Sequence, residues 1–152
     1  VLIIQIPLGM YLVDMDFSEK RLTIENIHVA VGISIFYLTV LRLIYKAFNP
    51  TPKLNNSIFP GQKIIAKLNH VFLYISILMI TISGALKKLY NGEELDMFFF
   101  NLEIQDNFEL AEIFYEIHIL GNYTLIALIS LHIFAVLIHK ILFKENLLKR
   151  IL

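Results

Sequence analysis

The sequence lacks cysteine, and this absence removes several kinds of cofactor site. Without thiolates the chain can form no disulfide, iron–sulfur cluster or thiolate zinc site, and it cannot attach haem covalently through a Cys-x-x-Cys-His motif. Any metal must be held by histidine or carboxylate. The sequence also has no excess of positive or negative charge, since 13 basic and 13 acidic residues give a formal net charge of +0. A nucleic-acid partner is therefore not expected.

Apolar residues are abundant instead. They make up 57% of the 152 residues, and the mean hydropathy is +0.69, more than a soluble domain usually carries. Three apolar runs can each cross a hydrocarbon core of about 30 Å, namely residues 27–47, 64–86 and 113–143. A shorter run, residues 1–13, is interpreted as a truncated first helix. The sequence predicts an all-α transmembrane four-helix bundle that forms a single domain over residues 1–152.

The basic residues predict how the bundle is oriented. The second connection is basic throughout, with Arg42, Lys46, Lys53, Lys63 and Lys67. The positive-inside rule places this connection, and the C-terminus, which is also basic, in the cytoplasm. The mainly acidic first and third connections are predicted outside. The Phe-rich residues 95–110 are expected along the membrane surface, where they could form a lid over the bundle.

All five histidines fall in or at the ends of predicted helices, where a polar side chain is costly unless it has a partner. A single intramembrane histidine more often forms an interhelical hydrogen bond than binds a metal. However, His118 and His132 are 14 residues apart, which places them on nearly the same helix face about 21 Å apart. One helix could therefore serve two stacked sites, as two haem groups across a bilayer require.

The predicted depth of each histidine in the membrane indicates which histidine could bind the same iron as His118 or His132. An iron with two axial histidines needs imidazoles from opposing helices at matching depth. His28 and His118 both begin their helices at the outer end and form the predicted outer pair. His70 and His132 lie in the inner half and form the inner pair visible in this sequence. Gly32 and Gly121 follow the outer histidines closely and could admit a flat macrocycle, or serve close helix packing.

Two further residues are candidates on the inner side. Arg42 follows His28 by 14 residues, on the same face at the opposite depth, and would suit a haem propionate or another anion. The alternative is an interfacial arginine that obeys the positive-inside rule. His139 lies about 10 Å beyond His132, at headgroup depth. It could hydrogen-bond a quinone carbonyl and exchange its proton, or be a solvated helix end.

The order of short motifs along the chain resembles the bacterial cytochrome b561 family over nearly the whole sequence. These motifs include Asn26-Ile27-His28-Val29, Asn49-Pro50-Thr51-Pro52, Leu68-Asn69-His70, Gly121-Asn122-Tyr123 and Leu131-His132. The resemblance implies a four-helix membrane protein that binds two non-covalent haem b groups per chain. It further implies electron exchange with the pool of ubiquinone or another quinone.

The resemblance leaves two roles open for His70. The family usually carries one inner-haem ligand on the first helix, in an Ile-His-Trp-like stretch, and the resemblance places the start of this chain just after that point. If that histidine is present upstream, His132 pairs with it, and His70 lines a cytoplasmic-side quinone pocket with His139. If it is not, His70 is the fourth ligand.

Three functions are compatible with these features. The first is a quinone-linked oxidoreductase that exchanges electrons with a basic protein or a small molecule on the outer face, such as superoxide attracted by Lys87 and Lys88. The second is a haem-bearing anchor or electron-transfer subunit of a separate dehydrogenase. The third is a zinc or copper transporter, which the scarcity of carboxylates inside the predicted spans disfavours, since Glu116 alone falls within one, near its outer end. An oligomer is compatible with each of them.

Overall fold

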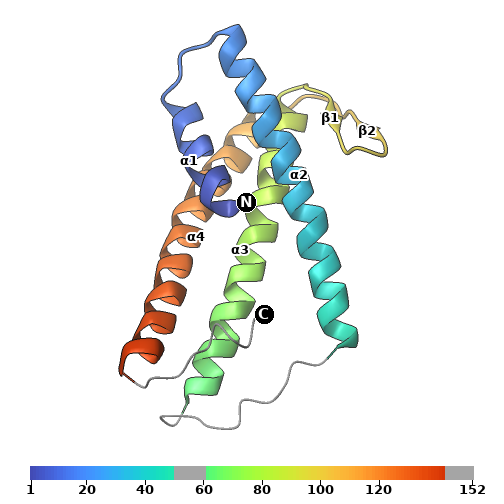
Figure 1. Ribbon diagram of the computed structural model, residues 1–152. Coiled ribbons are helices and arrows are strands. Elements are labelled where there is room, and N and C mark those ends of the chain that lie inside the picture. Colours follow the sequence, from blue (N-terminus) through green and yellow to red (C-terminus); the bar gives the residue numbers. More distant parts are fainter. Residues whose placement is uncertain (50–60, 143–152) are drawn as a thin grey trace.

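The computed structural model describes residues 1–49 and 61–142, and in these ranges it contains four helices and one two-stranded hairpin (Figure 1). The elements are α1 Leu2–Val13, α2 Glu19–Phe48, α3 Gln62–Tyr90, β1 Leu95–Asp96, β2 Asn101–Leu102 and α4 Phe108–Leu142. The helices α2, α3 and α4 are long and apolar enough to cross a membrane. The predicted all-α transmembrane bundle with a short first helix is therefore confirmed. The predicted end of the last helix at Phe143 lies outside the described residues.

The helices α2, α3 and α4 begin earlier than the apolar runs that predicted them. The side chain of Ser18 accepts a hydrogen bond from the backbone N–H of Arg21 at 3.2 Å and caps α2 at Glu19. In the same way the Asn107 side chain accepts from the N–H of Leu110 at 3.1 Å and caps α4. Such caps satisfy the free N–H groups of the first turn. An apolar run marks the stretch that lipid can surround, whereas a capped helix can continue into water.

The bundle packs mainly through α3. This helix contacts α4 along much of its length and also contacts α2, whereas α1 lies beside the outer half of α2 (Figure 1). Gly121 of α4 lies at the α3–α4 contact, since a Cβ there would come within 2.8 Å of Ile80 Cγ1 and 3.1 Å of Met79 Cε. The packing alternative considered for Gly121 thus fits its position, because a missing side chain lets two helices approach closely.

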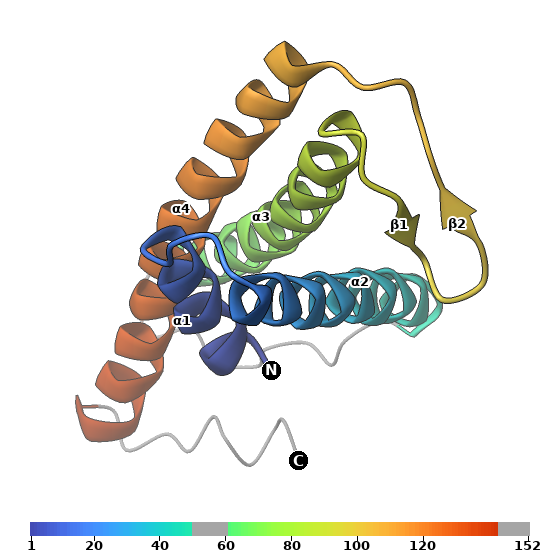
Figure 2. The same ribbon diagram turned by 90° about the horizontal axis from the view of Figure 1, so that it is seen from above.

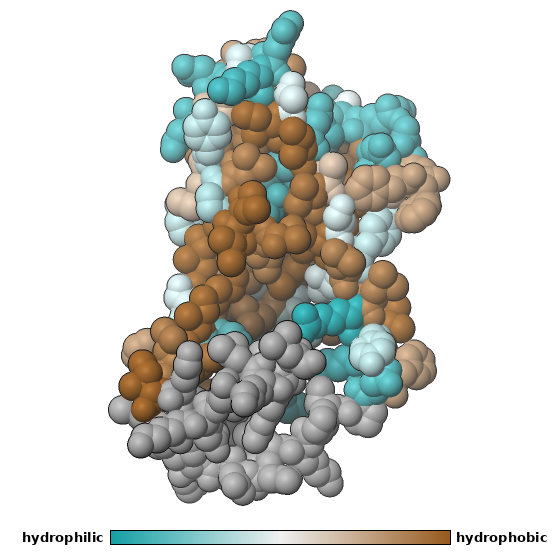
Figure 3. Space-filling view, viewed as in Figure 1, coloured by the Kyte–Doolittle hydropathy of each residue, from teal (hydrophilic) through white to brown (hydrophobic). Residues whose placement is uncertain are grey.

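Apolar side chains cover the middle of the molecule, and hydrophilic ones gather at the end that carries the α1–α2 connection and the hairpin (Figure 3). This end is called the outer end below, after its predicted orientation. The small buried core of the described residues includes Ile33, Leu89 and Leu95. Most large apolar side chains of the spans are exposed, as expected where lipid surrounds the bundle.

The hairpin joins α3 to α4 at the outer end. Its strands pair antiparallel, with Leu95 opposite Leu102 and Asp96 opposite Asn101. Seen from above, it projects on the side of α2 that faces away from α1 and α4 (Figure 2). Its base is anchored in the bundle, because Leu95 is only 1% exposed. Its far end therefore does not form the lid over the bundle that the sequence suggested.

Candidate functional site

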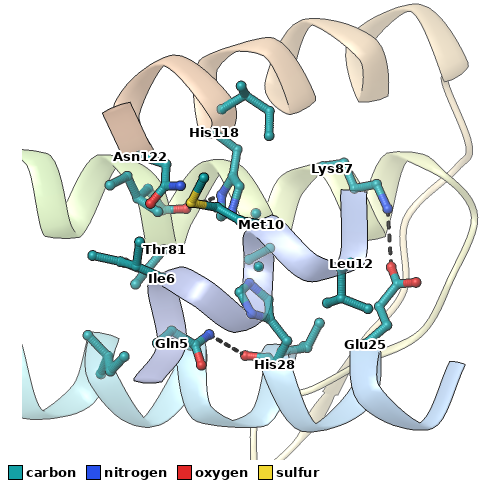
Figure 4. Close-up of a pocket in the computed structure, with 18 of the residues that line it drawn as sticks. Gln5, Ile6, Met10, Leu12, Glu25, His28, Thr81, Lys87, His118 and Asn122 are labelled. Carbon is teal, nitrogen blue, oxygen red and sulfur yellow. Dashed lines mark hydrogen bonds and ion pairs between the residues drawn. The ribbon is translucent and has the colours of Figure 1, made fainter. Parts of the chain in front are cut away.

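His28 of α2 and His118 of α4 face each other at the outer end of the bundle (Figure 4). The centroids of their imidazole rings are 6.2 Å apart, and the ring planes are inclined by 75°. An imidazole nitrogen binds a metal such as zinc at about 2 Å, so two axial imidazoles on one ion have centroids about 6 Å apart. The outer pair predicted from the sequence is thus brought together at a separation that suits a single metal ion.

A cavity of about 360 Å³ contains both rings and is lined by residues of all four helices. This volume falls within the range of about 300–1,000 Å³ that is usual for small-molecule and cofactor sites. The wall is mainly apolar. Charged residues gather toward its outer end, and they are Asp14, Arg21, Glu25, Lys87 and Lys88.

The ring nitrogens of the two histidines fit metal binding. The Nδ1 of His118 lies 2.9 Å from the carbonyl oxygen of Ile80. Because a carbonyl oxygen only accepts, Nδ1 must carry the proton, and the lone pair of Nε2 is free for a ligand. The Nδ1 of His28 is buried and has no hydrogen-bond partner among the described residues. Buried polar atoms nearly always have a partner, and a group or a water bound in the cavity would supply one.

Two glycines that the sequence reasoning missed lie directly against the histidine rings. A Cβ at Gly9 would come within 2.9 Å of His28 Cε1, and a Cβ at Gly84 would come within 2.9 Å of both Cε1 and Nδ1 of His118. No side chain therefore fits at either position without moving an imidazole. The sequence did contain a clue, because each of these glycines lies inside an apolar run. A glycine in such a position often has a packing or functional reason.

Gln5 is a third residue that the sequence reasoning missed. Its side chain is 8% exposed, and its Nε2 donates a hydrogen bond to the backbone oxygen of His28 at 2.8 Å. Gly32, which was predicted at this site, does line the cavity, and a Cβ there would lie 3.8 Å from Gln5 Nε2. Gln5 thus ties α1 to α2 at the level of His28. The clue to Gln5 in the sequence was its polar side chain within a continuous apolar run.

The inner histidines also meet. The ring centroids of His70 in α3 and His132 in α4 are 5.3 Å apart, with the planes inclined by 55°. The Nδ1 of His132 lies 3.0 Å from the side-chain nitrogen of Asn69. The Asn69 Oδ1 is buried without a partner among the described residues. Because the two ends of an amide are assigned from its hydrogen bonds, a flipped Asn69 would accept from His132 Nδ1 and free Nε2 for a metal.

The surroundings of His70 are cationic. Arg42 and Lys46 of α2 lie close enough to His70 to act on it electrostatically. The Lys46 ammonium also lies 5.0 Å from the centre of the Tyr74 ring, within range of a cation–π contact. Arg42 is exposed in the structure. His139 continues α4, but its side chain lies outside the described residues, so its predicted quinone role stays a prediction.

The outer lysines are paired with carboxylates. Lys87 Nζ lies 3.2 Å from Glu25, and Lys88 Nζ lies 2.6 Å from Glu93. The sequence suggested these lysines as an attractive patch for a small anion. Their ion pairs offset part of that positive charge, so a new anion would compete with Glu25 and Glu93 for them.

Comparisons with known proteins indicate one family. The family model described as "Prokaryotic cytochrome b561" matches residues 1–152. A relative named "Cytochrome b561 homolog 2", from Escherichia coli (strain K12), is 25% identical over 149 residues, covering 95% of this chain and 79% of the relative. Another from the same organism, "Cytochrome b561 homolog 1", is 28% identical over 137 residues, covering 89% and 78%.

Proposed function

This chain belongs to the prokaryotic cytochrome b561 family, and we propose that it carries electrons between a redox partner on the outer face and the quinone pool. Membership makes it a multi-pass membrane protein that binds haem b and transfers electrons. Two haem groups per chain, the quinone and the outer partner are part of the proposal. When bound, haem b supplies a one-electron redox centre. The facing pair His28 and His118 is the observation that carries the proposal.

The residues of the outer site are suited to a haem pocket. His28 and His118 would hold the iron, and the carbonyl of Ile80 keeps the His118 ring in the tautomer with a free Nε2. Gly9 and Gly84 leave the rings unobstructed. The cations of the cavity wall, Arg21, Lys87 and Lys88, would hold the propionate carboxylates. For this the two lysines would exchange their ion pairs with Glu25 and Glu93 for pairs with the propionates.

At the inner site we propose His132 as one ligand. The rings of His70 and His132 meet across α3 and α4, which supports His70 as its partner, and binding one ion would move the rings slightly apart from their present 5.3 Å. The exposure of His70, and the cations near it, support the other alternative, in which His70 meets a quinone and a first-helix histidine of the family pattern binds the iron. In both cases the chain would bind quinone near His70 and His139, on the cytoplasmic side of the bacterial inner membrane.

The outer end favours some redox partners over others. Exposed carboxylates surround the α3–α4 connection, namely Glu94, Asp96, Glu103 and Asp106. Complementary charge accelerates encounter and like charge slows it. A basic protein or a small molecule is therefore the better partner for this end. Electron exchange with a basic protein should slow as the ionic strength is raised, because salt screens exposed charges.

Haem content of histidine variants tests the proposal. In the detergent-purified protein, the pyridine haemochromogen assay should count two haem b groups per chain. His28→Ala and His118→Ala should each lose one of them, while Tyr123→Phe, at another residue of the same cavity, should retain both. Full haem content in both histidine variants would overturn the assignment.

The same assay separates the two roles of His70. Loss of one haem group in His70→Ala would identify a ligand. Two haem groups together with a raised KM for quinone would identify a residue of the quinone site. His132→Ala is the reference, because it should lose the inner haem group under either alternative.

A further inference from the structure

Three consecutive phenylalanines form the turn of the hairpin between β1 and β2, and they are called the aromatic tip below. Phe98, Phe99 and Phe100 are 52%, 83% and 53% exposed. Phenylalanine side chains are strongly favoured out of water, and a contiguous exposed apolar group usually marks a surface that binds something. The described contacts of the chain leave this surface largely uncovered.

The backbone of the tip is held in a costly conformation. Phe98 has φ +67°, in the left-handed region that a bulky residue seldom adopts. The Asp96 carboxylate accepts a hydrogen bond from the N–H of Phe98 at 2.7 Å, and the N–H of Met97 donates to the carbonyl of Phe100 at 3.0 Å. These bonds satisfy polar groups of the turn within the hairpin, which an approach to lipid requires.

Contacts with α2 place the tip beside a membrane span. The hydroxyl of Tyr37 donates to the carbonyl of Met97 at 3.1 Å, and the Tyr37 ring lies 5.9 Å from the ring of Phe99. Tyr37 lies within the apolar stretch of α2, next to Leu38, which is 59% exposed, and one turn before Leu41, which is 61% exposed. The tip therefore lies next to the lipid-facing side of α2, away from α1 and α4 (Figure 2).

We propose that the aromatic tip inserts its phenylalanine side chains into the lipid leaflet at the outer end of the bundle. Aromatic side chains favour the interface between headgroups and acyl chains. The strand residue Asp96 is exposed and would stay at headgroup level. The hairpin then acts as a side anchor that fixes the α3–α4 connection against α2. Because Leu95 at its base lines the cavity, the anchor also holds that wall in place. The proposal rests on the membrane-spanning fold and does not depend on the proposed function.

The sequence offers a clean test, because it contains no tryptophan. Phe99→Trp introduces a fluorophore at the most exposed position of the tip, and the emission of the protein without this substitution is subtracted as the background. The purified protein is reconstituted into phosphatidylcholine nanodiscs with either normal or acyl-chain-brominated lipid. We expect a blue-shifted emission and a lower intensity in brominated lipid. Comparing the two lipids at constant haem content cancels energy transfer to haem.

Two further variants calibrate the measurement. Phe17→Trp is the matched control, since Phe17 is 81% exposed but lies in the α1–α2 connection, and its emission should be insensitive to brominated lipid. Leu38→Trp reports full lipid exposure on α2. If Phe99→Trp does not yield folded protein, Phe100→Trp serves the same test.

Two results would overturn the proposal. A red-shifted emission from the Phe99→Trp variant that aqueous acrylamide quenches and brominated lipid does not would place the tip in water. A blue-shifted emission that neither agent quenches would mean that protein covers the tip, for example a second copy of the chain.

Discussion

Replacing Gly84 with alanine would place a methyl group 2.9 Å from two ring atoms of His118. Real Cβ contacts are rarely shorter than 3.4 Å, so either the ring or the helix must move. The ring has little freedom, because its Nδ1 is held 2.9 Å from the carbonyl of Ile80. In the protein without haem the ring can still rotate away by giving up this one hydrogen bond, whereas coordination to iron would hold it in place as well. The steric cost therefore falls mainly on the haem-bound state.

The size of this effect follows from known overpacking penalties. Inserting a methyl group into a well-packed site costs about 1–3 kcal/mol. At about 1.4 kcal/mol per tenfold change in affinity, haem binding at the outer site should weaken by roughly 5- to 150-fold. Alanine is also a better helix former than glycine by about 1 kcal/mol. That gain applies with and without haem, so it leaves the haem affinity unchanged.

The assay is the rate of haem transfer from the purified protein to apomyoglobin, with haem content measured before the transfer. Gly32→Ala is the matched control, because Gly32 lines the same cavity but its Cβ would meet Gln5 Nε2 at an ordinary 3.8 Å. Transfer should be faster in Gly84→Ala and unchanged in Gly32→Ala. Equal rates in the two variants would refute the argument that contact with His118 makes Gly84 necessary.

Three other substitutions test separate contacts. Gln5→Leu removes the donor to the His28 carbonyl and should lower the free energy of unfolding by about 0.5–1.5 kcal/mol. An unchanged Tm, measured by following the Soret band during melting, would contradict this prediction. Asn69→Leu removes the polar partner of His132 Nδ1 and should shift one midpoint potential in a redox titration, whereas a shift in both would show a general disturbance. Gly121→Val overfills the α3–α4 contact and should cost about 1–3 kcal/mol, seen as a lower Tm with an unchanged haem spectrum.

Much of the site could be predicted because helical geometry is local. The 14-residue spacing of His118 and His132 fixes their relative depth and face whatever surrounds the helix. The depth of His28 follows from its place in an apolar run that must match the bilayer. These constraints sufficed to pair His28 with His118 and His70 with His132, and the structure brings both pairs together.

Contacts between helices could not be predicted in the same way. Gly9, Gly32, Gly84 and Gly121 look alike in the sequence, yet Gly9 and Gly84 meet the histidine rings and Gly121 meets Ile80. Which neighbour a glycine meets depends on how each helix is rotated about its axis. Side-chain packing sets that rotation in a membrane, where lipid is as apolar as the helix surface.

The sequence by itself determined the membrane spans, the absence of thiolate ligands and the depths of the histidines, because composition and helical rise act within one segment. The tertiary structure decided the pairing of Lys87 with Glu25, the hydrogen bond from Gln5 to His28 and the position of the aromatic tip beside α2. Each of these joins segments far apart in the chain, and only the packing of the helices brings them within hydrogen-bonding distance.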